Sequence, residues 1–123
     1  MSWQVLFHGE FLPEFRELPE DVQDELLARL KVLETMGPSL GRPNVDTLEG
    51  SEFGNMKELR FQLDGVWRFA FAFDPRRVAI VLCGGDKENK KSKTFYRKLI
   101  ETADRRFKAH IASLEKPAKG SKP

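Results

Sequence analysis

The arginines of three successive expected strands are the side chains in this chain best suited to chemistry. The strands are expected at residues 56–63, 66–73 and 77–83. Because side chains alternate between the two faces of a strand, Arg60 and Arg68 should share the face opposite the apolar side chains. Guanidinium groups fixed on a rigid sheet bind phosphate well. The pattern indicates a phosphate-binding surface, and RNA is the first ligand to consider.

RNA can be cut without a metal ion because its own 2′-hydroxyl can attack the adjacent phosphorus. This leaves a 2′,3′-cyclic phosphate and a 5′-hydroxyl, and it needs a base, an acid and cations against the developing negative charge. Arg68 is the first candidate for such a cation and Arg60 the second. Each has a structural alternative, which is pairing with a carboxylate: Glu58 or Asp74 for Arg68, and a cross-strand partner for Arg60.

Two lysines and one tyrosine are candidates for proton transfer. Lys57 opens the first strand, and Lys87 follows Gly84-Gly85, where glycines allow the backbone to approach a ligand closely. A lysine crowded by other cations has a lowered pKa and can exchange protons near neutrality. Tyr96, at the start of the last helix, can stack on a base or share a proton with an amine. Solvated lysines and a half-buried packing tyrosine are the alternatives.

The segment after Lys87 is strongly basic and is a candidate RNA-backbone contact. Its cations are Lys90, Lys91, Lys93 and, on the polar side of the last helix, Arg97. The net charge of +2 conceals an asymmetry, because residues 1–54 carry 4 basic and 11 acidic side chains, whereas residues 55–123 carry 17 basic and 8 acidic. Such a dipole turns the C-terminal half toward a polyanion. An ordinary solvated loop explains the lysines equally well.

Composition excludes several other classes of protein. No apolar run approaches the roughly 20 residues of a membrane helix, and the N-terminus does not resemble a signal peptide. The single cysteine, Cys83, excludes an internal disulfide and is expected to be a buried apolar residue in a reducing cytoplasm. Two histidines and one cysteine give no metal-ligand cluster, so we expect neither a metal nor a cofactor.

The elements that must position these residues predict an α+β fold. A short strand, edge or parallel, is expected at residues 3–7. Two N-terminal helices follow it, and the second starts at Pro19. A loop at 38–54 then leads into the three strands. The last helix has an apolar face of Phe95, Leu99, Ala103, Phe107 and Ile111. We expect one domain at residues 1–115 and a disordered basic tail at 116–123. The helices should pack on the aromatic face of a small antiparallel sheet, leaving the arginine face at least partly open.

Four ordered segments resemble the RelE/ParE toxin superfamily, and most closely its phage-derived HigB-like branch. They are Met56-Lys57-Glu58-Leu59-Arg60, Trp67-Arg68 with Phe73-Asp74-Pro75-Arg76, Gly84-Gly85-Asp86-Lys87, and Phe95-Tyr96 with Ala103-Asp104. The resemblance implies a RelE-like fold and the toxin of a type II toxin–antitoxin module. It further implies ribosome-dependent cleavage of mRNA, a HigA-like helix-turn-helix antitoxin as partner, and contact with DNA only through that antitoxin.

The resemblance leaves the target and the general base open. The ParE branch shares the fold but inhibits DNA gyrase without catalysis, and an inactive phage-derived interaction protein is a further alternative. Many relatives have a second basic residue where this chain has Glu58. Glu58 is therefore either the general base or a structural partner of the arginines.

Overall fold

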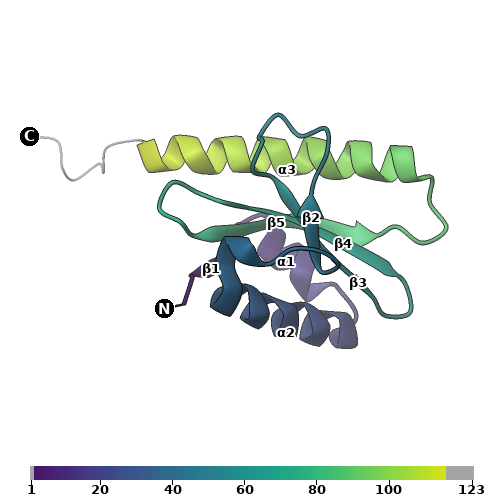
Figure 1. Cartoon of the computed structure of the whole chain (residues 1–123). Helices are drawn as coiled ribbons and strands as arrows, with labels where there is room; N and C mark the ends of the chain where they lie inside the picture. The colour runs from purple at the N-terminus through teal and green to yellow at the C-terminus, as the bar shows by residue number, and fades with distance from the viewer. Residues whose placement is uncertain (1, 116–123) are drawn as a thin grey trace, which may run out of the picture.

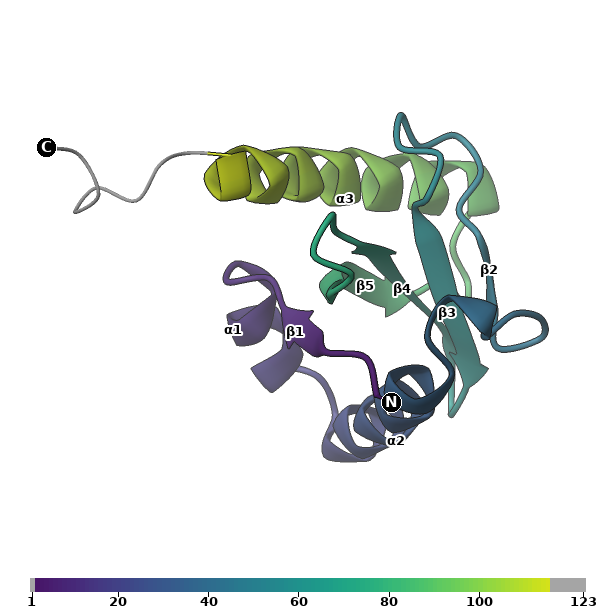
Figure 2. The ribbon, with the colours of Figure 1, turned by 60° about the vertical axis from the view of Figure 1, so that its left-hand side comes forward.

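A sheet lies between helices on both of its faces in a computed structural model that describes residues 2–115 (Figure 1). Helix α3 (Ser92–Glu115) crosses one face, and α1 (Phe11–Arg16) and α2 (Glu20–Met36) lie on the other, as Figure 2 shows from a second direction. A short 3₁₀ turn, η1 (Gly37–Ser39), follows α2. The tail expected at 116–123 lies outside the described residues.

The sheet has five strands in the order β1-β5-β4-β3-β2. They are β1 (Val5–Phe7), β2 (Val45–Thr47), β3 (Lys57–Gln62), β4 (Val66–Phe73) and β5 (Ala79–Asp86). Strands β3, β4 and β5 form the expected antiparallel meander, and β1 pairs in parallel with β5 at the edge, also as expected. Strand β2 was not predicted, because three residues with one apolar side chain give no periodic signal.

The aromatic face of the sheet packs against α1 and α2, as the alternation of β3 and β4 predicts. Residues such as Leu59, Phe69 and Phe71 are each 1% exposed. They form one core with the apolar stripe of α2, which consists of Val22, Leu26, Leu30 and Leu33. Each such buried side chain contributes about 1.5–3 kcal/mol of transfer free energy, so this core fixes the orientation of β3 and β4.

Much of the opposite face, which was expected to stay at least partly open, is also covered, and it remains accessible at Arg60, whose side chain is 35% exposed. Helix α3 packs on it with Leu99, Ala103 and Phe107, against sheet residues that include Ala70 and Ala72. The small alanines of β4 allow the helix to approach closely. The signal for a second core was the almost continuous apolar run of β5, which is typical of a strand buried on both faces.

A β-bulge in β5 shifts the register and changes which of its side chains face α3. Phe71 pairs with Val81 and Ala70 with Cys83, so Leu82 is an extra residue and both Leu82 and Cys83 belong to the α3 core. Beyond the bulge, Gly84 lies opposite Phe69, and a Cβ atom there would come within 2.0 Å of the Phe69 ring. Glycine is therefore required at this position, and the strand continues past its predicted end at Cys83 as far as Asp86.

Candidate active site

Three predicted residues from three different elements form one hydrogen-bonded cluster. Arg68 of β4 donates from Nε to the Tyr96 hydroxyl of α3 at 3.1 Å, and that hydroxyl donates to Oε1 of Glu58 in β3 at 2.7 Å. Arg68 Nε also lies 3.6 Å from the same Glu58 oxygen. The tertiary fold therefore brings a cation, a carboxylate and a hydroxyl into direct contact.

The cluster is more buried than the sequence predicts. Glu58 and Arg68 are each 7% exposed, because the first turns of α3 lie over them. Arg68 also donates from Nη1 to the carbonyl of Trp67 at 3.0 Å, which fixes its guanidinium. The predicted alternative of pairing with Glu58 is thus present, and the guanidinium is held rigidly rather than freely exposed on an open face.

Arg60 is the more accessible of the two arginines. It is the cross-strand partner of Arg68, and its side chain is 35% exposed. Its Nη1 lies 3.9 Å from Oδ2 of Asp46 in β2, and Arg42 holds the same oxygen at 3.0 Å. Like charges directly opposite in a sheet repel each other, and an anion placed between Arg60 and Arg68 would relieve this repulsion.

A hollow of about 490 Å³ lies beside the two arginines. Besides Arg60 and Arg68, its lining includes Arg29 of α2, Asn44 from the segment before β2, and Gln62 at the end of β3. Arg29 donates from Nη1 to Oδ1 of Asn44 at 2.9 Å. Sequence reasoning missed Arg29 and Asn44, because no local pattern links an isolated polar helix residue or a loop residue to a distant strand.

Burial and hydrogen bonding determine the protonation state of Tyr96. Burial raises the pKa of the Tyr96 hydroxyl above its ordinary value, and the hydrogen bond to Glu58 raises the pKa further, while the bond from Arg68 opposes this shift. Tyr96 therefore keeps its proton at neutral pH. It is suited to donate a proton, and Glu58 is suited to accept one.

The two candidate lysines lie in different places. Lys87 Nζ lies 5.9 Å from the centroid of the Tyr96 ring, so this lysine joins the cluster from the end of β5. Lys57 Nζ instead lies 3.4 Å from the Thr47 hydroxyl, its partner across the β2–β3 pair. Alternation places Lys57 on the α2 face of β3, away from Glu58 and Arg60.

The four basic residues predicted to contact RNA surround the start of α3. Lys90 donates from Nζ to the Asp86 carbonyl at 2.7 Å, and Lys90 and Lys91 line a second hollow between α3 and β5. Lys93 and Arg97 are exposed on the first turns of α3. These residues border the cluster without making its hydrogen bonds.

The two histidines, His8 and His110, lie apart from the cluster. His110 Nε2 lies 2.9 Å from Oδ2 of the buried Asp74, and His8 Nδ1 accepts the backbone N–H of Glu10 at 3.0 Å. Within residues 2–115, no three His, Cys, Asp or Glu side chains gather where they could hold a metal ion. In the same range no helix is long and apolar enough to cross a membrane.

The class of fold is defined by solved structures. The free E. coli toxin RelE, as a mutant, superposes with a TM-score of 0.58 at 19% identity, covering 80% of this chain and 97% of that one. RelE in the archaeal RelE–RelB complex of Pyrococcus horikoshii gives 0.53 at 22% identity, covering 72% and 99%. The fold is therefore RelE-like, with its α+β architecture as predicted.

Sequence comparison then gives the family. The model of the family described as "Phage derived protein Gp49-like (DUF891)" matches residues 13–108, and the chain belongs to this family. "Putative toxin HigB2" of Mycobacterium tuberculosis is 42% identical over 80% of this chain, which spans 49% of that relative. "Putative toxin HigB3" of the same organism is 43% identical, covering 80% of this chain and 85% of that relative. The predicted resemblance to the HigB-like branch is confirmed.

Proposed function

We propose that this protein is the toxin of a type II toxin–antitoxin module and a metal-independent endoribonuclease that cuts mRNA on the ribosome. Support for a toxin comes from the relatives, two of which are named as putative HigB toxins. The observation that carries the nuclease proposal is geometric. Arg60 and Arg68 line one hollow, and Arg68 is hydrogen-bonded to Tyr96, which is itself hydrogen-bonded to Glu58.

The proposed reaction uses the hollow for the scissile phosphate. Arg60 and Arg68 contact its non-bridging oxygens and stabilise the charge that develops as the 2′-oxygen attacks phosphorus. Glu58 takes the 2′-hydroxyl proton, and Tyr96 gives its proton to the departing 5′-oxygen. The hydrogen bond of 2.7 Å between Tyr96 and Glu58 then returns the proton from the carboxyl group to the phenolate. Lys87, beside the Tyr96 ring, adds positive charge near the leaving oxygen.

The burial of this cluster supports dependence on the ribosome. Glu58 and Arg68 are each 7% exposed, so only a phosphate presented in a defined orientation reaches them. A ribosome that holds the message fixed supplies this orientation, and positioning alone contributes several kcal/mol to such reactions. The proposed regulatory partner is a HigA-like helix-turn-helix antitoxin. The archaeal RelE–RelB complex is a solved case of a RelE-like chain bound to a second protein.

The test compares two arginines that pair with the same carboxylate. Arg60 and Arg42 both contact Asp46, but Arg60 lines the hollow, whereas the Arg42 side chain is 79% exposed. In a translation extract we expect Arg60→Ala to slow cleavage of mRNA by about 10²-fold, the effect of removing one transition-state donor, and Arg42→Ala to have no effect. The 5′ fragments should carry 2′,3′-cyclic phosphate.

Two results would contradict the proposal. Equal activity of the Arg60→Ala and Arg42→Ala proteins would remove Arg60 from the reaction. Growth arrest by the wild-type chain with intact messages and inhibited DNA gyrase would support the ParE-like alternative instead.

A further inference from the structure

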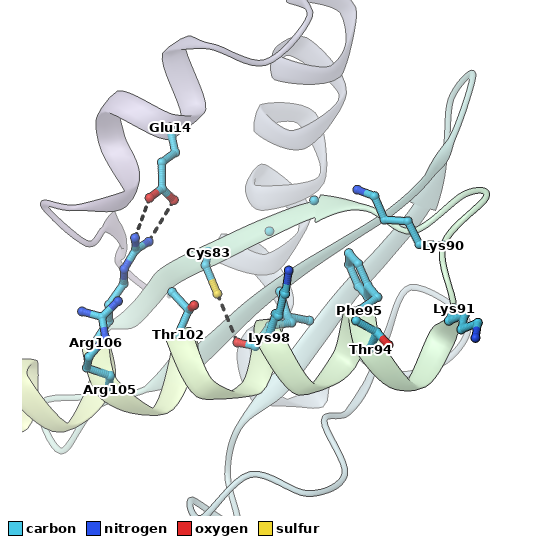
Figure 3. Close-up of a pocket in the computed structure, with 13 residues that line it drawn as sticks. Glu14, Cys83, Lys90, Lys91, Thr94, Phe95, Lys98, Thr102, Arg105 and Arg106 are labelled. Carbon is cyan, nitrogen blue, oxygen red and sulfur yellow. Dashed lines mark hydrogen bonds and ion pairs between the residues drawn. The ribbon is translucent and has the colours of Figure 1, made fainter.

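A second hollow, separate from that of Arg60 and Arg68, lies between α3 and the outer edge of β5. It has a volume of about 650 Å³, and Figure 3 shows the residues that line it. Its lining contains the five cationic side chains Lys90, Lys91, Lys98, Arg105 and Arg106. The carboxylate in the lining, Glu14, is held by two hydrogen bonds from Arg106, of 2.9 and 2.5 Å. Arg105 also contacts the Glu10 carboxylate at 3.4 Å, while Lys91 and Lys98 are exposed. The groove therefore keeps a net positive charge.

The floor of this groove presents unpaired backbone. Strand β1 pairs with β5 only from Ala79 to Val81, so within residues 2–115 no strand lies beside Gly84 on the side of β5 that faces away from β4. Paired residues in an antiparallel ladder alternate between those that exchange hydrogen bonds and those that do not. Since Lys87 donates to the Val66 carbonyl, the pair of Gly84 and Phe69 falls in the second class. The N–H and C=O of the exposed Gly84 therefore point into the groove.

An aromatic ring forms part of the groove wall. Phe95 is half-buried in α3, and its ring would lie 3.4 Å from a Cβ atom on Gly85. Lys90 Nζ lies 5.9 Å from the centroid of the Phe95 ring. A positively charged groove with an aromatic side chain is the usual arrangement for binding single-stranded nucleic acid, because the backbone follows the cations and a base stacks on the ring.

The groove adjoins the candidate active site around the start of α3. The rings of Phe95 and Tyr96 pack edge to face, with their centroids 5.4 Å apart. Phe95 lies on the groove side, and Tyr96 belongs to the cluster. On the sheet below, Gly85 is the cross-strand partner of Arg68. A polynucleotide leaving the cluster past Lys87 would thus meet Lys90 and then the groove.

We propose that this groove binds the single-stranded RNA that flanks the scissile phosphate, which rests on the proposed nuclease function. The phosphates lie along Lys91, Lys98 and Arg105, and the Gly84 N–H donates to one of them. An acidic peptide added as a strand to β5 fits less well. The Asp86 carbonyl already accepts a hydrogen bond from Lys90, and the Leu82 carbonyl accepts one from Arg106, so an added strand would have to compete for both carbonyls.

The first experiment measures binding of an RNA that cannot be cleaved. A fluorescent 2′-O-methyl hexanucleotide lacks the attacking hydroxyl, so its binding to the intact wild-type chain can be followed by anisotropy. We expect Lys98→Glu to weaken binding about tenfold and to reduce the slope of log affinity against log salt by about 0.7, the value for one single-strand phosphate contact. Lys31→Glu, on an exposed position of α2, is the matched control and should bind normally.

The second experiment locates the ligand without any substitution. In amide NMR spectra, the Gly84 N–H resonance should shift on addition of the hexanucleotide, whereas that of Gly41, outside the groove, should not. Wild-type affinity of Lys98→Glu, or a Gly84 resonance that shifts with an oligoglutamate peptide but not with RNA, would overturn the proposal.

The result for the groove is separable from the result for the nuclease. Binding of the hexanucleotide at Gly84 with no cleavage of any message would leave the groove assignment intact and refute the proposed reaction.

Discussion

Replacing Tyr96 by phenylalanine removes one oxygen atom and tests both roles of the cluster. The lost interaction is the hydroxyl donated to Glu58 at 2.7 Å, together with the bond accepted from Arg68 at 3.1 Å. A hydrogen bond to a charged group contributes about 1.5–3 kcal/mol. Arg68 Nε remains 3.6 Å from the Glu58 carboxylate and can move closer. We therefore expect Tyr96→Phe to lower the free energy of unfolding by about 1.5 kcal/mol, at the low end of that range.

The effect on catalysis should be much larger than the effect on stability. If Tyr96 protonates the leaving oxygen, its loss should slow cleavage by about 10²–10⁴-fold. Urea unfolding measures the first quantity, and single-turnover cleavage of a ribosome-bound message measures the second. A threefold change in rate corresponds to a difference of only about 0.65 kcal/mol in barrier height. If Tyr96→Phe loses the expected stability but cleaves within about threefold of the wild-type rate, Tyr96 has no catalytic role and is a packing residue.

Glu58→Gln is the companion variant, because the glutamine amide oxygen can still accept the hydrogen bond from the Tyr96 hydroxyl. The substitution keeps the shape of the cluster and removes the charge that would take the 2′-hydroxyl proton. Loss of cleavage in both variants supports the proposed pair of base and acid. Loss only in Tyr96→Phe would exclude Glu58 as the base.

The pH dependence of stability gives an independent check on Tyr96. Burial, together with the bond to Glu58, raises the pKa of Tyr96 in the folded chain above its ordinary value. The unfolded chain therefore loses this proton first. The stabilisation by Tyr96 is complete below the unfolded pKa of about 10, and it is lost as pH rises through the higher folded pKa. Tyr96→Phe should lack this alkaline loss, and identical alkaline profiles would contradict the assignment.

Two further predictions concern buried residues outside the cluster. Asp74 is 4% exposed and is hydrogen-bonded to His110 and to the backbone N–H of Val78. In a urea titration, Asp74→Ala should therefore lower the free energy of unfolding by about 3 kcal/mol. The control Asp24→Ala, at an exposed position of α2, should change it by less than about 0.5 kcal/mol. A loss below about 1 kcal/mol for Asp74→Ala would show that these bonds contribute little. Burial raises the pKa of Cys83 to about 12, so iodoacetamide at neutral pH should label this thiol only when the chain unfolds, and rapid labelling of the folded chain would contradict its burial.

The acid side of the stability profile depends on Asp74. Burial acts to raise the pKa of this carboxyl, but hydrogen bonds from His110, Arg76 and the backbone outweigh burial and lower it below its ordinary value. The stabilisation is therefore present above the unfolded pKa and is lost as pH falls through the lower folded pKa. The ionised Asp74 carboxylate, through its hydrogen bond with His110, therefore anchors the β4–β5 hairpin to α3 over the physiological pH range.

Much of the fold could be predicted from local patterns. The alternation of β3 and β4 predicted the aromatic core, because a side chain on a strand has only two faces available. The four-residue spacing of apolar positions predicted the buried face of α3, and the comparisons confirmed the HigB-like resemblance found in the ordered motifs. The short β2 and the bulge at Leu82 were missed, since both depend on pairing with a distant strand rather than on local pattern.

The sequence by itself determined which residue types were available for chemistry, and the parity of β3 and β4 placed Arg60 and Arg68 on a common face. Only the tertiary structure decided what surrounds them. Packing of α3 on the alanines of β4 buries Arg68 under Tyr96, and α2 supplies Arg29 to the hollow. Such contacts depend on how close two helices approach the sheet. That distance is set by the summed volumes of side chains far apart in the chain, which no local pattern records.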